Sequence, residues 1–193
     1  KIIALKGLGG FHLIADATLD PTIQVLRARK HRKTKPFGVM YPSLTAIQED
    51  CYVSSAEKSL LCSAMAPIVL VLRKPVAAIS SWVAPDNPYL GVMLPYTPLH
   101  YLLLQALKRP IVATSGNRAS EPICIDNQEA LEQLQDCADF FLVHNRPIIN
   151  RVDDSIARIM AAQMTLLRRS RGFTPLPIEL NESTQAPILG VGG

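Results

Sequence analysis

Basic side chains crowd into one short segment of this sequence, between residues 27 and 35. On a helix, repulsion between such closely spaced like charges costs about 0.2–0.5 kcal/mol per pair. A bound polyanion removes that cost, because Arg offers phosphate a planar fork and Lys a mobile point charge. The segment therefore indicates a triphosphate or polynucleotide ligand, with a solvated helix face as the alternative. Its basic residues are Arg27, Arg29, Lys30, Arg32, Lys33 and Lys35, and Arg168, Arg169 and Arg171 form a second cluster.

A polar loop follows a short apolar run at residues 111–113. Open α/β sheets place their ligands where strands end, and this loop carries two hydroxyl groups and an amide, at Thr114, Ser115 and Asn117. These groups suit a phosphate or a ribose. A hydrogen-bonded turn explains the same residues equally well.

Two adjacent carboxylates, Asp153 and Asp154, are candidates for a magnesium site. Magnesium commonly takes only one or two protein carboxylates and completes its shell with phosphates and water. Ion pairs with Arg151 or Arg158 are the alternative. The sequence has no Gly-x-Ser-x-Gly elbow and no His-Glu-x-x-His motif, so nothing in it indicates a hydrolase.

A glycine turn, residues 6–10, follows the first apolar run of the chain. Glycines let backbone N–H groups approach an anion closely. The turn lacks the Gly-Lys-Ser/Thr of a Walker loop and the third glycine of the dinucleotide fingerprint. It therefore predicts either an anion-binding loop or a plain tight turn.

Apolar runs alternate with helical patterns along the chain, which predicts an α/β fold with a twisted mixed sheet. We expect helices to begin near residues 18–21, at Ser43, at Ser54 or Ser55, at Thr97-Pro98 and at Asp126. Pro36 is expected to end the first of them. The expected strands are residues 2–5, 37–41, 68–72, 91–94, 111–113, 140–143, 155–159 and 165–168.

The composition is that of one globular domain. The chain has 193 residues, 48% of them hydrophobic and 19% charged, with a net charge of +4. No apolar run approaches the roughly 20 residues needed to cross a bilayer, so no membrane partner is expected. The cysteines form no CxxC pair, which predicts free thiols, no zinc and a reducing, cytoplasmic location. They are Cys51, Cys62, Cys124 and Cys137.

The chain begins on Lys1 rather than Met and ends in a glycine-rich stretch. Both features suggest a domain taken from a longer protein. We expect a nucleotide-binding domain over residues 1–180. Residues 181–193 are expected to be a linker and the start of a following domain.

Several blocks together resemble the YrdC-like domain of the HypF carbamoyltransferases, over about residues 1–180. Lys-Gly-Leu-Gly-Gly-Phe-His-Leu at residues 6–13 resembles the opening of that domain, and residues 27–40 resemble its Arg-Lys-x-Arg-x-x-Lys-Pro segment. Thr114-Ser115-Gly116-Asn117 is similar to a loop shared by the wider YrdC family. Further blocks at residues 144–147, 151–155 and 167–172 follow in the same order. The end of the chain, residues 188–193, resembles the beginning of the transferase domain that follows in that family, so the domain that starts within residues 181–193 is expected to be a transferase domain.

This resemblance implies a YrdC-like sheet with flanking helices and a concave basic face, together with a reaction. The domain would join ATP to carbamate derived from carbamoyl phosphate, giving carbamoyl-adenylate and pyrophosphate. Magnesium would accompany the ATP. The full-length protein would then pass the carbamoyl group to HypE during maturation of nickel–iron hydrogenases.

The resemblance also implies roles for individual residues. Lys30, Arg32 and Lys35 would carry catalysis by neutralising the triphosphate and the leaving pyrophosphate. Asp153 and Asp154 would hold the metal. The remaining nucleotide-binding residues would be Lys6, Thr114, Ser115, Asn117, Ser155, Arg168 and Arg171. We expect Lys6, Lys30, Arg32, Thr114, Ser115, Asn117 and Ser155 to surround one pocket.

Two rival functions remain open at this stage. A threonylcarbamoyl-adenylate synthase acting in tRNA modification would share the fold. The relatives of that type carry Pro-Thr-Asp-Thr-x-Tyr-Gly-Leu where residues 6–13 stand here, so this chain lacks the Thr and Tyr side chains of that motif. A double-stranded-RNA-binding module would explain the basic clusters.

Overall fold

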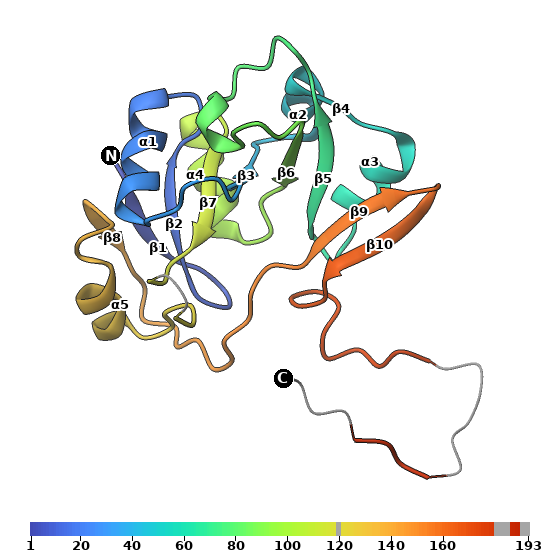
Figure 1. Cartoon of the computed structure of the whole chain (residues 1–193). Coiled ribbons are helices and arrows are strands. Elements are labelled where there is room, and N and C mark those ends of the chain that lie inside the picture. Colours follow the sequence, from blue (N-terminus) through green and yellow to red (C-terminus); the bar gives the residue numbers. More distant parts are fainter. Residues whose placement is uncertain (119–120, 180–185, 190–193) are drawn as a thin grey trace.

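The computed structural model describes residues 1–118, 121–179 and 186–189. In this part of the chain one mixed sheet of ten strands runs through the molecule, in the order β10-β9-β5-β6-β3-β7-β2-β1-β8, with β4 paired to β5. The predicted α/β mixed sheet is confirmed. Figure 1 shows the β9–β10 hairpin at one end of the sheet and β8 with α5 at the other.

The helices are α1 Asp20–Arg29, α2 Leu44–Asp50, α3 Ser55–Leu61, α4 Pro98–Leu107 and α5 Asn127–Leu134, with a 3₁₀ helix η1 Ser81–Val83. The strands are β1 Ile3–Lys6, β2 Phe11–Asp16, β3 Gly38–Met40, β4 Cys51–Tyr52, β5 Ile68–Arg73, β6 Tyr89–Met93, β7 Ile111–Ser115, β8 Phe140–Leu142, β9 Ile156–Met160 and β10 Gln163–Arg168.

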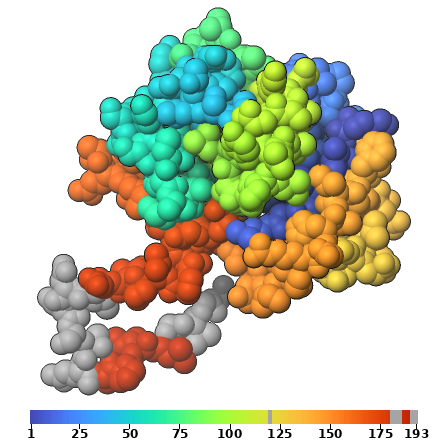
Figure 2. All heavy atoms as spheres, turned by 180° about the vertical axis from the view of Figure 1, so that it is seen from behind, coloured from blue at the N-terminus to red at the C-terminus, as the bar shows by residue number. Residues whose placement is uncertain are grey.

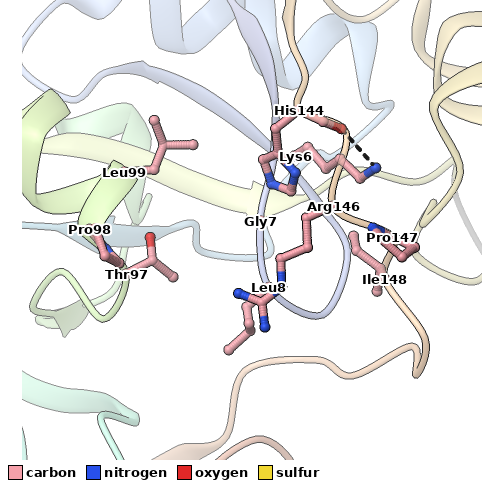
Figure 3. Close-up of a pocket in the computed structure, with 10 residues that line it drawn as sticks. All are labelled: Lys6, Gly7, Leu8, Thr97, Pro98, Leu99, His144, Arg146, Pro147 and Ile148. Atoms are coloured by element: carbon pink, nitrogen blue, oxygen red, sulfur yellow. Dashed lines mark hydrogen bonds between the residues drawn. The ribbon is translucent and has the colours of Figure 1, made fainter.

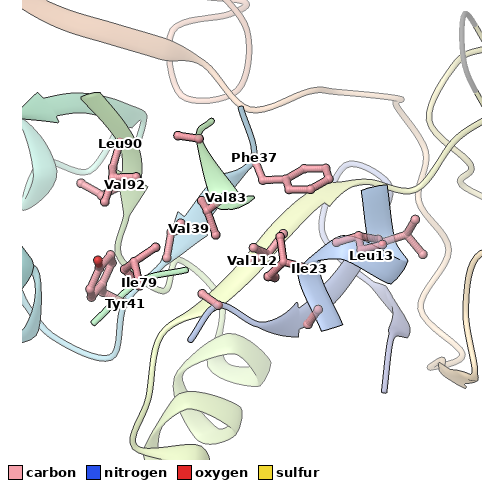
Figure 4. Packing of buried hydrophobic residues seen from close by; sticks show 14 of the residues in the cluster. Leu13, Ile23, Phe37, Val39, Tyr41, Ile79, Val83, Leu90, Val92 and Val112 are labelled. Atoms are coloured by element: carbon pink, nitrogen blue, oxygen red, sulfur yellow. The ribbon is translucent and has the colours of Figure 1, made fainter. Parts of the chain in front are cut away.

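Strand residues point alternately to the two faces of the sheet. On one face, Leu13, Val39 and Val112 join the large hydrophobic core to residues of α1, α2, α3, α5 and η1 (Figure 4). On the other face, Met40 and Met93 belong to a smaller cluster that includes Leu104 of α4. Among the described helices, α4 alone packs on this second face, so part of the sheet there has no helix over it.

The helix starts follow the predicted caps. Ser43 and Thr97 each accept a hydrogen bond from the backbone N–H three residues on. Ser54 forms a full capping box with Glu57, and Asp126 accepts from Gln128 and Glu129. These short-range signals are reliable because a cap is a contact within one turn of chain.

Two expectations about elements were wrong. Residues 11–16 form strand β2, although the sequence predicts no strand there. The helix α1 ends at Arg29 rather than continuing toward Pro36, because His31 adopts a left-handed backbone with a φ of 49°. Residues 30–37, called the basic loop below, therefore leave α1 and cross toward the sheet.

The proposed boundary at residue 180 lies outside the described residues, as does most of the predicted linker at 181–193. Among the helices of the described chain, none combines the length and the apolar character that a membrane span requires.

Candidate functional site

A cavity of about 360 Å³ opens on the face of the sheet that α4 leaves uncovered. One part of its wall is apolar, with Ile68, Leu70 and Leu167 above a floor that includes Gly38 and Gly91. These glycines are register partners on adjacent strands β3 and β6. A Cβ at Gly91 would lie 3.0 Å from Ile68, and one at Gly38 would lie 3.2 Å from the carbonyl of Ala113. The paired glycines thus leave a flat apolar slot, a shape that suits a planar ring.

A second cavity, of about 430 Å³, adjoins the first and is strongly basic. Arg32, Lys35 and Ser115 line both cavities. Lys30, Lys33 and Arg118 complete the cationic wall, and no Asp or Glu is among the described residues that line it. A ligand with an apolar ring at one end and several negative charges at the other fits this pair of cavities.

The basic loop is hydrogen-bonded to the end of β7, at Thr114 and Ser115, and to Asn117 in the loop that follows. Arg32 Nη1 donates to Thr114 Oγ1 at 2.8 Å, and Lys30 Nζ donates to the carbonyl oxygens of Ser115 and Asn117 at 2.6 and 3.0 Å. Lys30 Nζ also reaches Asn117 Oδ1 at 3.2 Å. The predicted approach of the end of α1 to Thr114 and Ser115 is therefore present.

Burial weakens the basicity of both cations. Burial and the nearby charge of Arg32 lower the pKa of Lys30 to about 8. Burial and the charges of Arg27 and Arg168 lower the pKa of Arg32 to about 10. Desolvation disfavours a charged form, so a bound anion would recover part of this cost. Lys30 is only partly charged near pH 8.

Arg27 is a residue that sequence reasoning had counted only as part of a cluster. Its side chain is buried and donates to five carbonyl groups, those of Arg32, Lys33, Lys35, Trp82 and Val83. These contacts hold the basic loop against η1. Arg27 thus shapes the loop and does not line either cavity.

The carboxylates at the other side of the first cavity are already paired. Asp154 Oδ1 accepts from Arg171 Nε at 2.9 Å, and Asp154 Oδ2 lies 3.3 Å from His12 Nε2. Burial alone would raise the pKa of Asp154, but the hydrogen bond and charge of His12, with those of Arg171, hold it well below its usual range. Asp153 is about half-exposed and lies 3.6 Å from Arg168.

This pairing does not suit the predicted magnesium site. Both oxygens of Asp154 face cationic or donor groups, which leaves Asp153 as the one carboxylate free to turn. Within residues 1–118, 121–179 and 186–189, no three His, Cys, Asp or Glu side chains group closely enough to hold a metal ion. The magnesium role of Asp153 and Asp154 stays a prediction, and it would rest mainly on Asp153 because both oxygens of Asp154 are engaged.

The family model for the Sua5/YciO/YrdC proteins, described as "Telomere recombination", matches residues 1–170. The chain belongs to this family.

Within it, the chain is similar to HypF carbamoyltransferases. It is 54% identical to that of Synechocystis over the whole chain, which covers 25% of the relative. It is 42% identical to the probable HypF of Methanocaldococcus jannaschii over 99% of the chain, again 25% of the relative. The chain spans about a quarter of the length of the curated relatives it matches.

Solved structures of HypF proteins are also similar to this chain. A full-length HypF in its phosphate- and nucleotide-bound form superimposes with a TM-score of 0.92 at 48% identity, covering 96% of this chain and 29% of that protein. The HypF of T. kodakarensis gives 0.90 at 41% identity, with 93% and 24% covered. The Sua5 of P. abyssi complexed with L-threonine gives 0.77 at 17% identity, over 88% of this chain and 50% of that one, a likeness of fold.

The YrdC-type cavity brings together some of the predicted residues and not others. Arg32, Lys35, Thr114, Ser115 and Arg168 line it, and Lys30 and Asn117 line the adjoining basic cavity. The prediction of one pocket does not hold for Lys6 and Ser155.

Ser155 is fully buried, with Oγ donating to the carbonyl of Arg171 and accepting from Ser170 N. It lies between Asp154 and Ile156, which both line the cavity. In extended chain, alternate residues face opposite sides, so Ser155 points into the protein. Arg171 likewise lies behind the cavity, tied to Asp154.

Lys6 belongs to a separate cavity of about 260 Å³ between the glycine turn and the start of α4. Its side chain is buried, and Nζ donates to the carbonyl of His144 at 3.2 Å. Figure 3 shows the ammonium turned toward His144 and away from Thr97 and Leu99 of α4. In Figure 2 the blue glycine turn reaches the surface between α4 and the orange residues near 144–150. Lys6 therefore lies away from the YrdC-type cavity.

His12 is a residue of the cavity that sequence reasoning missed. It is buried on β2, lines the YrdC-type cavity and faces Asp154. Its signal in the sequence was a histidine inside an otherwise apolar run after the glycine turn. Without strand β2, that position could not be assigned to a face.

Proposed function

We propose that this chain is the YrdC-like, ATP-binding domain of a HypF-type carbamoyltransferase, and that it forms carbamoyl-adenylate from ATP and carbamate. The observation that carries the proposal is the sharing of Arg32, Lys35 and Ser115 between an apolar slot and a basic cavity. A purine in the slot would place its triphosphate on the cationic wall. The phosphate- and nucleotide-bound HypF, with a TM-score of 0.92, supports the same assignment.

The reaction balances without a protein base. A carboxylate oxygen of carbamate forms a bond to the α-phosphorus of ATP, and the bond from that phosphorus to the oxygen bridging the β-phosphate breaks. The electron pair leaves with pyrophosphate. No proton moves, so the protein needs only to align the reactants and neutralise the charge that builds on the leaving group.

The residues divide this work by position. Lys35 and Lys33, whose side chains are exposed at the basic cavity, would meet the β- and γ-phosphates. Arg32, fixed by Thr114 and by the carbonyl groups of Lys35 and Pro36, would stand between the α-phosphate and the leaving group. Lys30 would keep the loop after β7 in place and add charge when protonated.

The larger function needs the rest of the protein. Carbamoyl phosphate would supply the carbamate, and HypE would receive the carbamoyl group through the full-length enzyme, of which the chain covers about a quarter in its relatives. The unpaired cysteines support the cytoplasm as the compartment.

Isotope exchange between pyrophosphate and ATP tests the proposal. Adding ammonium carbamate to the protein with ATP and labelled pyrophosphate should move label into ATP, since formation of the adenylate is reversible. Sodium bicarbonate without ammonium is the control for carbonate species, because it forms no carbamate, and sodium bicarbonate with L-threonine tests the rival synthase. Exchange that depends on threonine, or ATP that fails to bind by calorimetry, would contradict the proposal.

A further inference from the structure

The helix α4 is apolar on its outer side as well as on the side that packs on the sheet. None of its ten residues is Asp, Glu, Lys or Arg. Leu104 is fully buried against the sheet, whereas Tyr101 and Leu102 are 55% and 66% exposed. A helix that is hydrophobic all round is normally buried on all sides. We therefore expect the outer side of α4 to be covered in the working protein.

The separate cavity of about 260 Å³ at the start of α4 extends this apolar surface. Leu8 of the glycine turn, Leu99 of α4 and Ile148 line it. Leu102 follows Leu99 by one turn, so the two side chains lie on the same side of the helix. Figure 2 shows α4, the glycine turn and the residues near 144–150 as neighbours on one surface. These four residues and Tyr101 are called the α4 face below, and such a contiguous apolar surface marks an interaction site.

The polar groups of the cavity suit a carboxylate. The two segments that contribute most to this surface, residues 87–120 and 140–152, contain no Asp or Glu. Arg146 lines the cavity and has no ion-pair partner among the described residues. In the same wall, Nδ1 of His144 is buried and has no hydrogen-bond partner in the described chain. Figure 3 shows both side chains across the cavity from Leu99. The α4 face therefore complements an apolar side chain with a carboxylate next to it.

We propose that another domain of the full-length HypF-type protein packs on the α4 face, with an apolar side chain in the cavity and a carboxylate on Arg146. The length of the relatives favours this occupant. The chain covers only 25% of the Synechocystis protein, so most of that polypeptide lies outside the match. Domains of one polypeptide pack through interfaces that mix apolar and polar contacts, as this face does. The inference rests on the proposed function, because it takes the chain as part of a HypF-type protein.

Thiol labelling at two exposed positions tests whether this face is covered. Leu102→Cys reports on the α4 face. Val25→Cys is the matched control, because Val25 is 45% exposed on α1, which packs on the opposite face of the sheet. Both are made together with Cys62→Ser, since Cys62 is the exposed cysteine of the chain. Peptide mapping after maleimide treatment measures each thiol separately.

Each variant is compared in two proteins. One is the chain alone, and the other is a full-length protein in which the chain replaces the matching quarter of Synechocystis HypF. In the full-length protein Leu102→Cys should react about tenfold or more slowly than in the chain alone, because labelling then requires the domains to open. Val25→Cys should react within about twofold of the same rate in both, because no opening is needed.

Two results would overturn the proposal. The first is that Leu102→Cys reacts at the same rate in both proteins, which would mean that no other domain covers the α4 face. The second is that its labelling in the chain alone slows as the protein concentration rises. A second copy of the chain would then be the occupant.

The charge of Arg146 gives a second measurement. In the full-length protein Arg146→Glu should speed the labelling of Leu102→Cys several-fold, because two carboxylates would then face each other. Arg146→Lys should leave the labelling rate unchanged. If Arg146→Glu also leaves it unchanged, the proposed carboxylate contact is wrong. Arg146 lines neither the YrdC-type cavity nor the basic cavity, so ATP binding and pyrophosphate exchange by the chain alone test the proposed function separately. The interface and the function can therefore fail independently.

Discussion

The two basic segments, residues 27–35 and 168–171, look alike in composition and differ in what their donors contact. In the first, Arg27 and Arg32 bind backbone carbonyl groups and thereby present Lys33 and Lys35 at the rim of the cavities. In the second, Arg171 is paired with Asp154 behind the cavity. Arg169 donates to the carbonyl groups of Phe173 and Leu176, which follow it in the chain.

The two segments show that the cations of a basic cluster can have two roles. Those whose N–H groups bind backbone carbonyls hold the fold, and those whose N–H groups remain unused can bind a ligand. Arginine, with five N–H groups in a rigid fork, saturates nearby carbonyls easily. Lysines on the same segment then carry the free charge. The sequence shows where basic residues cluster, but only the hydrogen bonds of the structure show which of them hold the fold and which can bind a ligand.

The largest expected effect is on stability in the second segment. Arg171→Ala should lower the free energy of unfolding by about 3–5 kcal/mol, because it leaves Asp154 buried beside one fewer cation. Arg169→Ala, at an exposed position, should change it by less than about 0.5 kcal/mol. Urea unfolding at pH 7 measures both. Equal effects of the two variants would show that Arg171 is not the scaffold residue of its segment.

The pH dependence of stability tests the role of Asp154 in the same pair. His12 and Arg171 hold the pKa of Asp154 below its ordinary value of 3.8. A carboxyl with a depressed pKa contributes stability that is fully present above its unfolded pKa and is lost as the pH falls toward the folded one. Stability should therefore decline below about pH 4, and Asp154→Asn should decline less steeply. Acid titrations of both proteins, followed by circular dichroism, check this.

The next effect in size concerns ATP in the first segment. Lys35→Ala should weaken ATP binding by about 1–3 kcal/mol, the range of a charge-assisted hydrogen bond, and leave stability nearly unchanged. Arg27→Ala is the contrasting variant, since it removes five contacts to carbonyls and should lower stability together with affinity. Calorimetry and thermal unfolding separate them. A stability loss in Lys35→Ala with intact ATP affinity would make that lysine structural.

A smaller effect follows from the pKa of Lys30, lowered to about 8 by burial and by Arg32. Burial disfavours the ammonium, so the neutral form gains as the pH rises through about 8. ATP affinity should then fall about tenfold between pH 7 and pH 9, a shift of one unit being about 1.4 kcal/mol. Lys30→Arg should flatten the profile, since guanidinium stays protonated. A flat wild-type profile would mean that Lys30 acts only as a fastening between loops.

Short-range signals predicted much of the fold. Ser43, Thr97 and Asp126 each cap a helix through contacts within one turn, so sequence alone placed those starts. Strand β2 was not predicted because both of its faces are covered. A strand buried on both faces lacks the alternation of apolar and polar residues that marks a half-buried strand.

The sequence predicted the part of the site that one basic segment builds, namely the approach of Lys30 and Arg32 to the end of β7. The role of Ser155 depends on which way an extended residue faces, and a shift of one residue reverses it. The pair of His12 and Asp154 joins positions 142 residues apart, and no local pattern reports such a contact.

The last expected effect, no larger than that of Lys30, is the response of ATP binding to salt, and it tests whether the two segments act together as one surface for RNA. Raising salt from 50 to 200 mM costs a protein that neutralises 6–10 phosphates roughly 10³–10⁵ in affinity. ATP presents only three phosphates, and its contacts would come from one rim, so its affinity should fall by only about tenfold. Calorimetry with ATP and electrophoretic mobility shifts with a double-stranded RNA, both across that salt range, measure the difference. If RNA binds tightly with a steep salt dependence, and Arg169→Ala weakens that binding as much as Lys33→Ala does, the two segments form one RNA-binding surface. If RNA binds weakly and Arg169→Ala does not change that binding, the two segments act separately. This is the expected result, because Arg169 donates to the carbonyl of Phe173 while Lys33 lines the basic cavity.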